Sequence, residues 1–328
     1  MSDLITPALS VVAPCYNEQE SLHELYRRLT TTCQNVSGSD YEIVLIDDGS
    51  KDRTRAIINE ICDADPRVVG VFLSRNHGQQ LALTAGLRVC RGERILIVDA
   101  DLQDPPELLG DMMKMMDEGA DVVYGQRAER DGETGFKKFT SAAFYRVLDR
   151  LVDVKIPVDT GDFRLMSRRA LNELNKLPEQ HRFIRGLVSW IGFKQVPIRY
   201  HRQARFAGET KYPLSAMIKI AMDAISGFSI LPLRVATYLG FVCALVGVVF
   251  MIWTLYSYFT GIAIQGWTTL MAVTLVLGSG QLLVLGVIGE YLGRLYMQSK
   301  NRPLFIIEEI KRGSSVVVPI EKTASVSG

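Results

Sequence analysis

Short apolar runs alternate with amphipathic segments along the first part of the chain. Five runs have the length and aliphatic character of buried strands: residues 9–14, 41–46, 68–73, 94–98 and 121–125. The segments between them carry apolar residues at helical spacing, as at Leu22, Leu25 and Leu29, and Ser21 is the expected N-cap of that helix. Strands and helices that alternate through short connections predict an α/β fold with a mostly parallel sheet and helices on both faces.

Further elements are expected beyond residue 150. We expect a helix over residues 181–191, a strand over 196–201 and a strand-like patch at 304–307. Residues 158–166 are apolar but are interrupted by acid, glycine and arginine, which a core strand would not need. The pattern therefore argues against a core strand at this position.

Two carboxylates follow the fourth apolar run directly. Asp99 and Asp101 stand one residue apart at the end of this strand, Gln103 follows, and Pro105 and Pro106 then end the extended segment and start a helix. Ligands of an open α/β sheet collect at the carboxyl ends of its strands, and Mg²⁺ or Mn²⁺ prefers hard oxygen ligands such as carboxylates. This position favours a metal site for a substrate diphosphate over the alternative, two solvated acids in a loop.

The turn after the first run contains no glycine, although dinucleotide-binding folds hold pyrophosphate on a glycine-rich turn at this place. It reads Pro-Cys-Tyr-Asn-Glu over residues 14–18, and the chain has no P-loop sequence either. A diphosphate must therefore be held by other means, and Asp99 and Asp101 with a divalent ion are the available device.

A long stretch without charge follows in the second half of the chain. No Asp, Glu, Lys or Arg occurs between Arg234 and Glu290. This length suffices for two membrane crossings of about 20 residues each, which we place at residues 235–259 and 268–292. Basic residues flank both ends of the stretch, so both ends are expected on the cytoplasmic side. A hairpin buried in a soluble core is the alternative.

Three more segments suggest contact with lipid or phosphate. Residues 136–152 place basic residues beside an apolar helical face, and residues 212–232 form a second segment with an apolar face. Such helices can lie at a membrane surface, although soluble amphipathic helices look similar. Residues 202–211 place three cations around a glycine turn, which suits phosphate binding; a solvated basic loop is the alternative.

The overall composition narrows the location of the chain and its partners. A net charge of +1 does not suggest a nucleic-acid partner. The five cysteines form no CxxC pair, which favours reduced thiols in the cytosol. No basic-then-apolar signal segment opens the chain, so the N-terminal domain is expected to stay in the cytoplasm.

Seven motifs, taken together and in this order, give the chain its family resemblance. They are Pro14–Glu18, Asp47–Ser50, Ser74–Gly78, Asp99–Glu107, Thr160–Met166, Arg205–Lys211 and Gly289–Arg294. With them the chain closely resembles the membrane-bound polyprenyl-phosphate glycosyltransferases of glycosyltransferase family 2, which include bactoprenol glucosyltransferases and dolichyl-phosphate mannose synthases. Two positions depart from the family pattern: His77 stands where an aromatic ring is frequent, and Gln126 stands where serine or threonine is commoner.

The resemblance implies a domain plan for nearly the whole chain. Residues 1–211 would form a cytoplasmic GT-A (Rossmann-like) nucleotide-sugar-binding domain that includes the interface helix at 136–152. Residues 212–232 would form a juxtamembrane amphipathic helix, 233–294 the two-helix transmembrane hairpin and 295–328 a cytoplasmic tail. The implied location is the inner (cytoplasmic) membrane.

The resemblance also implies a role for individual residues. Pro14, Tyr16, Glu18, Asp47 and Asp99 would bind the nucleotide, and Asp99, Asp101 and Gln103 would surround a Mg²⁺ or Mn²⁺ ion. Arg127, Lys138, Arg205 and Lys211 would bind the acceptor phosphate. Asp162 and Asp101 would be catalytic, with the role of Asp162 as a base or a positioning group left open.

The implied reaction is an inverting, metal-dependent transfer of a sugar to a polyprenyl (undecaprenyl) phosphate. UDP-glucose is the favoured donor; GDP-mannose, UDP-GlcNAc and an aminoarabinose nucleotide are alternatives. A processive polysaccharide synthase is a rival, but its usual QxxRW motif and additional spans are missing from the sequence. A non-catalytic membrane scaffold is the rival from another class. Glycines in the spans would allow close helix packing, which makes a homo-oligomer, for example a tetramer, plausible.

Overall fold

The computed structural model describes residues 6–127, 157, 160–180, 182–201, 231–260, 266–313 and 315–317. The chain divides into two compact units. The first unit consists of Met1–Asp149, Val154–Met217 and Pro303–Gly328, and the second of Arg150–Asp153 and Ile218–Arg302. The interface segments expected at 136–152 and 212–232 lie outside the described residues.

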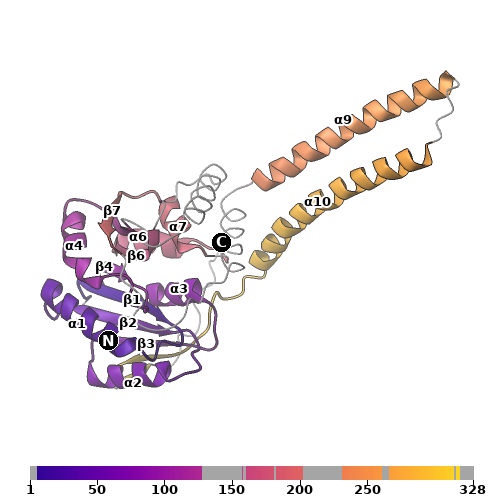
Figure 1. The fold of residues 1–328 in the computed structure, drawn as a ribbon. Coiled ribbons are helices and arrows are strands. Elements are labelled where there is room, and N and C mark those ends of the chain that lie inside the picture. Colours follow the sequence, from indigo (N-terminus) through magenta and orange to yellow (C-terminus); the bar gives the residue numbers. More distant parts are fainter. Residues whose placement is uncertain are drawn as a thin grey trace, which may run out of the picture. The chain divides into compact units, whose positions relative to one another are not determined.

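A nine-stranded mixed sheet forms the centre of the first unit (Figure 1). The strands are β1 (Leu9–Cys15), β2 (Tyr41–Asp47), β3 (Val68–Leu73), β4 (Arg94–Ile97), β5 (Val122–Arg127), β6 (Thr160–Ser167), β7 (Gln195–Tyr200), β8 (Ile307–Arg312) and β9 (Ser315–Val317). Their order across the sheet is β7-β5-β6-β4-β1-β2-β3-β8-β9. The five strands expected in the first part of the chain, and the one expected at 196–201, are confirmed to within one or two residues.

The sheet is less parallel than expected. Strands β4, β1, β2 and β3 are parallel to one another, but β6 runs antiparallel to both of its neighbours, and β8 runs antiparallel to β3 and β9. The interrupted segment at 158–166 is thus largely a central strand, contrary to our interpretation. Its charged residues are tolerated because Asp162 and Arg164 hydrogen-bond within the protein.

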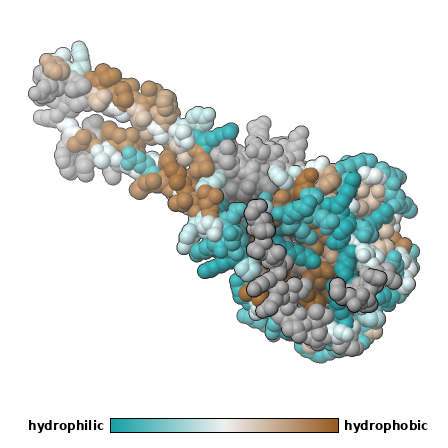
Figure 2. Space-filling model, turned by 180° about the vertical axis from the view of Figure 1, so that it is seen from behind, coloured by the Kyte–Doolittle hydropathy of each residue, from teal (hydrophilic) through white to brown (hydrophobic). Residues whose placement is uncertain are grey.

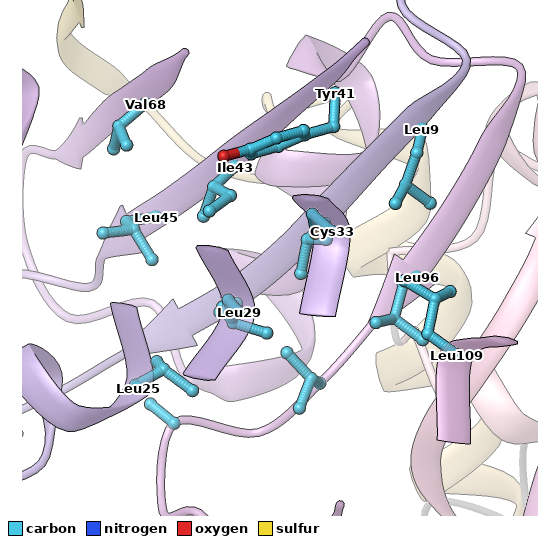
Figure 3. Packing of buried hydrophobic residues seen from close by; sticks show 14 of the residues in the cluster. Leu9, Leu25, Leu29, Cys33, Tyr41, Ile43, Leu45, Val68, Leu96 and Leu109 are labelled. Atoms are coloured by element: carbon cyan, nitrogen blue, oxygen red, sulfur yellow. The ribbon is translucent and has the colours of Figure 1, made fainter. Parts of the chain in front are cut away.

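Helices cover both faces of the sheet. They are α1 (Leu22–Ser37), α2 (Thr54–Ala64), α3 (Gln79–Val89), the 3₁₀ turn η1 (Pro106–Leu108), α4 (Leu109–Asp117), α6 (Arg168–Lys176) and α7 (Ile184–Trp190). On one face α1, α2 and α4 bury their apolar residues against alternate residues of the strands, as Figure 3 shows for Leu29 and Leu109. On the other face α3 packs on the sheet and contacts α6, which contacts α7.

Ser21 is the N-cap of α1, as expected, but its hydroxyl donates to the Glu18 carboxylate and makes no side-chain cap bond. The expectation for the tail strand is wrong in its bounds. The tail strand begins at Ile307, where the patch expected at 304–307 ends. Its sequence is mostly charged, so its apolar pattern was too weak to place it.

The tail strand β8 is fixed by charge as well as by backbone pairing with β3. Arg55 of α2 contacts Glu308 at 2.8 Å and Glu309 at 3.1 Å. Lys311 contacts Asp63 of α2 at 2.8 Å. The C-terminal segment is therefore a structural part of the first unit.

Two long apolar helices make up the described part of the second unit. They are α9 (Leu231–Phe259) and α10 (Trp267–Ser299), and they contact each other. Within them Leu233–Trp253 and Val276–Ser299 are long and apolar enough to cross a membrane, with mean hydropathy 2.4 and 1.4. Most of their large apolar side chains are exposed, which gives the brown surface along these helices in Figure 2. Length, composition and exposure fit the expected hairpin.

Gly86 sets how closely α3 approaches the sheet. A Cβ atom at this buried position would lie 2.5 Å from Ile46 Cδ1 and 2.6 Å from Val12 Cγ1. We expect Gly86→Ala to lower the free energy of unfolding by about 1–3 kcal/mol, because the core must shift to accept the methyl group. The midpoint of thermal unfolding in detergent measures the change. The control is Gly110→Ala in α4, where the nearest atom, Val36 Cγ2, is 3.8 Å away; this variant should be at least as stable as the unaltered protein.

Candidate active site

The carboxyl ends of the four parallel strands lie side by side and form one edge of the sheet. The expected nucleotide-binding residues lie along this row of strand ends. Pro14 pairs in register with Ile46, so the turn that contains Tyr16 and Glu18 emerges beside Asp47. Asp47 is buried and accepts a hydrogen bond from the Ser50 backbone N–H at 3.1 Å. These four predicted residues therefore share one edge.

Hydrogen bonds join the turns after β1 and β2. Asn17 has a positive φ of 53°. Its backbone N–H donates to Ser50 Oγ at 3.0 Å, and its side-chain oxygen accepts from the Lys51 N–H at 2.9 Å. The Glu18 N–H donates to Thr54 Oγ1 at 2.8 Å. The two turns therefore form one preorganised surface beside the strand ends.

Cys15, the last residue of β1, has a buried side chain. Burial, followed by the nearby charges of Glu18 and Asp47, raises the pKa of its thiol far above the ordinary value. A thiolate nucleophile at this position is therefore disfavoured.

The loop after β3 is attached to the end of β2 through Asp48. Its carboxylate accepts hydrogen bonds from the backbone N–H groups of His77 at 2.7 Å and Gly78 at 2.9 Å. Burial, and then the charge of Arg75, lower the pKa of His77, so this imidazole is neutral at pH 7. The loop leads directly into α3.

The predicted metal ligands lie on the turn after β4. Asp99 Oδ1 accepts a hydrogen bond from Gln79 Nε2 at 2.8 Å. Asp101 Oδ1 accepts one from the Gln103 backbone N–H at 3.1 Å, across Leu102, whose φ is 59°. Asp99, Asp101 and Gln103 are all half-buried and lie on this one turn at the end of the strand.

Negative charge accumulates around Asp99. Burial, and then the charges of Asp162, Asp104 and Asp101, raise its pKa to about 8, against the opposing effect of Arg185. A bound cation would relieve this repulsion, and carboxylate oxygens are the ligands that Mg²⁺ and Mn²⁺ prefer. The residues present therefore fit a divalent metal ion, with Asp99 and Asp101 as the first candidates to hold it.

The predicted catalytic residue Asp162 comes from β6 and is 1 % exposed. Ile97 of β4 pairs with Arg164, so Asp162 lies level with Asp99 just beyond the end of β4. Its Oδ1 accepts from Arg185 Nε at 2.9 Å and its Oδ2 from Gln80 Nε2 at 2.9 Å. Burial alone would raise the pKa of Asp162, but Arg185, Arg164 and Gln80 outweigh burial and hold the pKa below its usual range.

Arg127 is the one predicted acceptor-site residue that the described part of the chain includes. A Cβ on Gly161 would lie 3.3 Å from Arg127 Nη2, which places the guanidinium beside the residue that precedes Asp162. The Tyr200 hydroxyl hydrogen-bonds with Arg127 and donates to the buried carboxylate of Asp104. Lys138, Arg205 and Lys211 lie outside the described residues.

The sequence analysis did not identify several residues that lie at this edge. They are Gln79, Gln80, Asp104, Arg185 and Tyr200. Gln79 and Gln80 directly follow the Ser74–Gly78 motif, and Asp104 lies inside the Asp99–Glu107 motif, so motif position could have indicated them. Arg185 and Tyr200 carry no comparable local signal, because only the fold brings them to this edge.

Comparison with protein families gives two matches. Residues 10–174 match the family described as "Glycosyl transferase family 2". Residues 231–295 match a second one, described as "GtrB C-terminal hairpin". The first match covers the parallel strands and β6, and the second covers most of α9 and α10.

Similar proteins of known sequence match along most of their length. A protein of Bacillus subtilis called "Uncharacterized glycosyltransferase YkcC" is 48% identical over 92% of this chain and 93% of its own. The "Bactoprenol glucosyl transferase" of Shigella phage SfII is 36% identical over 93% of this chain and 99% of its own. Among solved structures, the crystal structure of S. aureus TarS 1-349 in complex with UDP-GlcNAc is 19% identical, covers 66% of this chain and 65% of its own, and has a TM-score of 0.47.

The family resemblance inferred from the seven motifs is thereby confirmed. The matched residues carry a GT-A-like α/β fold followed by a hairpin of apolar helices. The chain belongs to glycosyl transferase family 2 and is a glycosyltransferase.

Proposed function

We propose that the protein transfers glucose from UDP-glucose to a polyprenyl phosphate, undecaprenyl phosphate in bacteria, at the cytoplasmic face of the inner membrane. The observation that carries this proposal is the full-length similarity to a bactoprenol glucosyl transferase, which includes the apolar hairpin as well as the sheet. The product would be a polyprenyl-monophosphate sugar that donates its sugar in a later glycan modification.

The sheet edge described above supplies the donor half of the site. Pro14, Tyr16, Glu18 and Asp47 would bind the base and ribose, next to Asp99. Asp99, Asp101 and Gln103 would hold Mg²⁺ or Mn²⁺, which when bound neutralises the departing diphosphate. The crowded carboxylates around Asp99 support this assignment, because a cation would relieve their repulsion of one another and of a diphosphate.

Binding of the acceptor phosphate requires positively charged side chains more than it requires a general base. A lipid monophosphate is already an anion at neutral pH, so the protein has to align it and balance its charge. Arg127 lies beside Gly161 at this edge, and Lys138, Arg205 and Lys211 are proposed to join it. A single in-line attack on the anomeric carbon would invert its configuration.

The membrane helices support a lipid acceptor and leave room for assembly. α9 and α10 together provide two spans, which fits an enzyme whose acceptor stays in the bilayer. Both termini would then lie in the cytoplasm. Glycines such as Gly280, whose Cβ would lie 3.5 Å from Cys243 Sγ of α9, allow close packing, and a homo-oligomer such as a tetramer is part of the proposal.

A panel of radiolabelled sugar nucleotides tests the reaction class and the donor. Membranes that contain the full chain are incubated with UDP-glucose, GDP-mannose, UDP-GlcNAc or an aminoarabinose nucleotide. We expect label from UDP-glucose to enter a lipid that extracts into organic solvent and is labile to mild acid. Label in a growing polymer would indicate a processive synthase instead, and no transfer from any donor would indicate a non-catalytic scaffold.

Substitution of one predicted metal ligand tests the donor site. We expect Asp101→Asn to abolish transfer, because an amide oxygen carries no charge for the metal, while the midpoint of thermal unfolding stays close to that of the unaltered protein. The matched control is Asp111→Asn, which removes a carboxylate from an exposed ion pair with Lys114 and should retain full activity. Activity of Asp101→Asn within a few-fold of the unaltered protein would contradict the metal assignment.

Metal removal tests the same site without a mutation. We expect EDTA to reduce the transfer of label to background, because uncompensated carboxylates repel the donor diphosphate. Added Mg²⁺ or Mn²⁺ in excess of the chelator should restore transfer, and the ratio of the two restored rates identifies the preferred ion. Full activity in EDTA after dialysis would show that the reaction needs no metal.

A further inference from the structure

Asp162 and Arg185 form an ion pair whose two members are unequally exposed. The side chain of Asp162 is 1 % exposed and that of Arg185 is 32 % exposed. The carboxylate lies in the central strand β6, whereas the guanidinium is carried by α7, which contacts that strand. Arg185 is therefore the member of the pair that solvent can reach.

The Asp162 carboxylate is occupied on both oxygens. Arg185 Nε donates to Oδ1 and Gln80 Nε2 donates to Oδ2, each at 2.9 Å. A carboxylate that accepts a hydrogen bond on each oxygen, with its charge balanced by a guanidinium, is a weak proton acceptor. The acceptor of the proposed reaction, a phosphate that is already ionised, has no need of such a base.

Arg185 is fixed by the same contacts. Its Nη1 donates to the Thr160 carbonyl at 3.1 Å in addition to the Asp162 bond, so two points on β6 hold the guanidinium. The carbonyl of the Gln80 side chain accepts from the Ile184 N–H at 3.0 Å, which ties the start of α7 to the start of α3. A guanidinium held in this way is preorganised, because little side-chain entropy remains to be lost when an anion binds.

The fixed guanidinium lies at the strand ends where the proposed site would hold the phosphates. Asp162 is level with Asp99 across the β4–β6 pair, and the Arg185 guanidinium contacts Asp162 at 2.9 Å, so it lies at the same strand ends as Asp99. Arg164, the other cation next to Asp162, is 3 % exposed and donates hydrogen bonds to the carbonyls of Gly161 and Asp162, so Arg185 is the more accessible cation.

We infer that Asp162 is a positioning residue that anchors Arg185, and that the Arg185 guanidinium binds a phosphate oxygen of the substrates. The inference rests on the proposed transfer between a nucleotide diphosphate sugar and a lipid phosphate. Two anions share this chemistry, the diphosphate of the donor and the phosphate of the acceptor. Asp162 then matters for transfer because it keeps Arg185 in place, not because it removes a proton.

A double-mutant cycle on the full chain in detergent, with UDP-glucose and a polyprenyl phosphate, tests the inference. Asp162→Asn and Arg185→Gln are each expected to lower kcat/KM by roughly 100-fold, the usual loss for one charge-stabilising donor. If Asp162 acts only through Arg185, the double variant is no slower than the slower single variant. A double variant whose loss is the product of the two single losses would overturn the inference, because Asp162 would then act on the substrates directly.

The Michaelis constants identify the anion. Arg185→Lys keeps the ion pair with Asp162 but loses the planar fork, so it should raise the KM of one substrate by about 10-fold with a smaller change in kcat. A raised KM for UDP-glucose assigns Arg185 to the diphosphate, and a raised KM for the lipid assigns it to the acceptor phosphate. Unchanged KM values for both substrates in Arg185→Lys and in Arg185→Gln would overturn the inference.

Controls separate loss of function from loss of fold. Arg169→Gln removes the α6 member of an ion pair with Asp121, which directly precedes β5, and should leave kcat/KM unchanged. Thermal unfolding of each variant is measured, and only variants that stay folded enter the double-mutant cycle. Arg185→Lys retains the charge balance and replaces Arg185→Gln in the cycle if Arg185→Gln does not fold. Failure of the unaltered protein to transfer sugar from any donor would overturn the proposed function and the inference together, whereas a multiplicative cycle in an active enzyme overturns the inference alone.

Discussion

Repulsion between carboxylates at one edge of the sheet is the constraint on which the site depends. Asp99, Asp101, Asp104 and Asp162 converge there from the end of β4 and from β6. Gathering like charges in a partly buried place costs free energy, so each acid needs a partner. The protein provides Arg185 and Gln80 for Asp162, Tyr200 for Asp104, Gln79 for Asp99 and the Gln103 backbone N–H for Asp101, and a metal ion at the Asp99–Asp101 turn is our proposal for the remaining charge.

The fold holds this balance through helix α3. Gly86 lets the helix lie directly on β1 and β2, and the first residues of the helix then reach two different strands. Gln79 holds the acid after β4, and Gln80 holds the acid in β6. A single helix thus fixes the spacing between the proposed metal site and the ion pair that faces it.

Sequence patterns predicted those elements correctly whose signal lies within the element itself. Parallel strands that are buried on both faces read as plain aliphatic runs, so β1 to β5 were placed closely, and the acids at the end of β4 stood out by position. Strand β6 was misread because the partners of its buried Asp162, Arg185 and Gln80, lie far away in the chain. Arg185 was missed for the same reason: its partner Asp162 lies on another element, and only the sheet brings the two together. The tail strand β8 was misplaced because its stability comes from pairing with β3 and from ion pairs rather than from apolar residues.

The position of β8 has a consequence for the order of synthesis. Strand β3 pairs with β2 on one side and with β8 on the other, and the residues of β8 follow both apolar helices in the chain. This side of β3 therefore stays unpaired until those helices have left the ribosome. The buried carboxylate of Glu42 can likewise form its ion pair with Arg312 only at that stage. Its other partners, Ser10 and Arg91, are synthesised before the apolar helices. Until then β3 presents an unpaired strand edge, which is prone to wrong pairing. Completion of the first unit therefore has to wait for the synthesis of both apolar helices, and a nascent chain arrested before them would carry an unpaired strand β3.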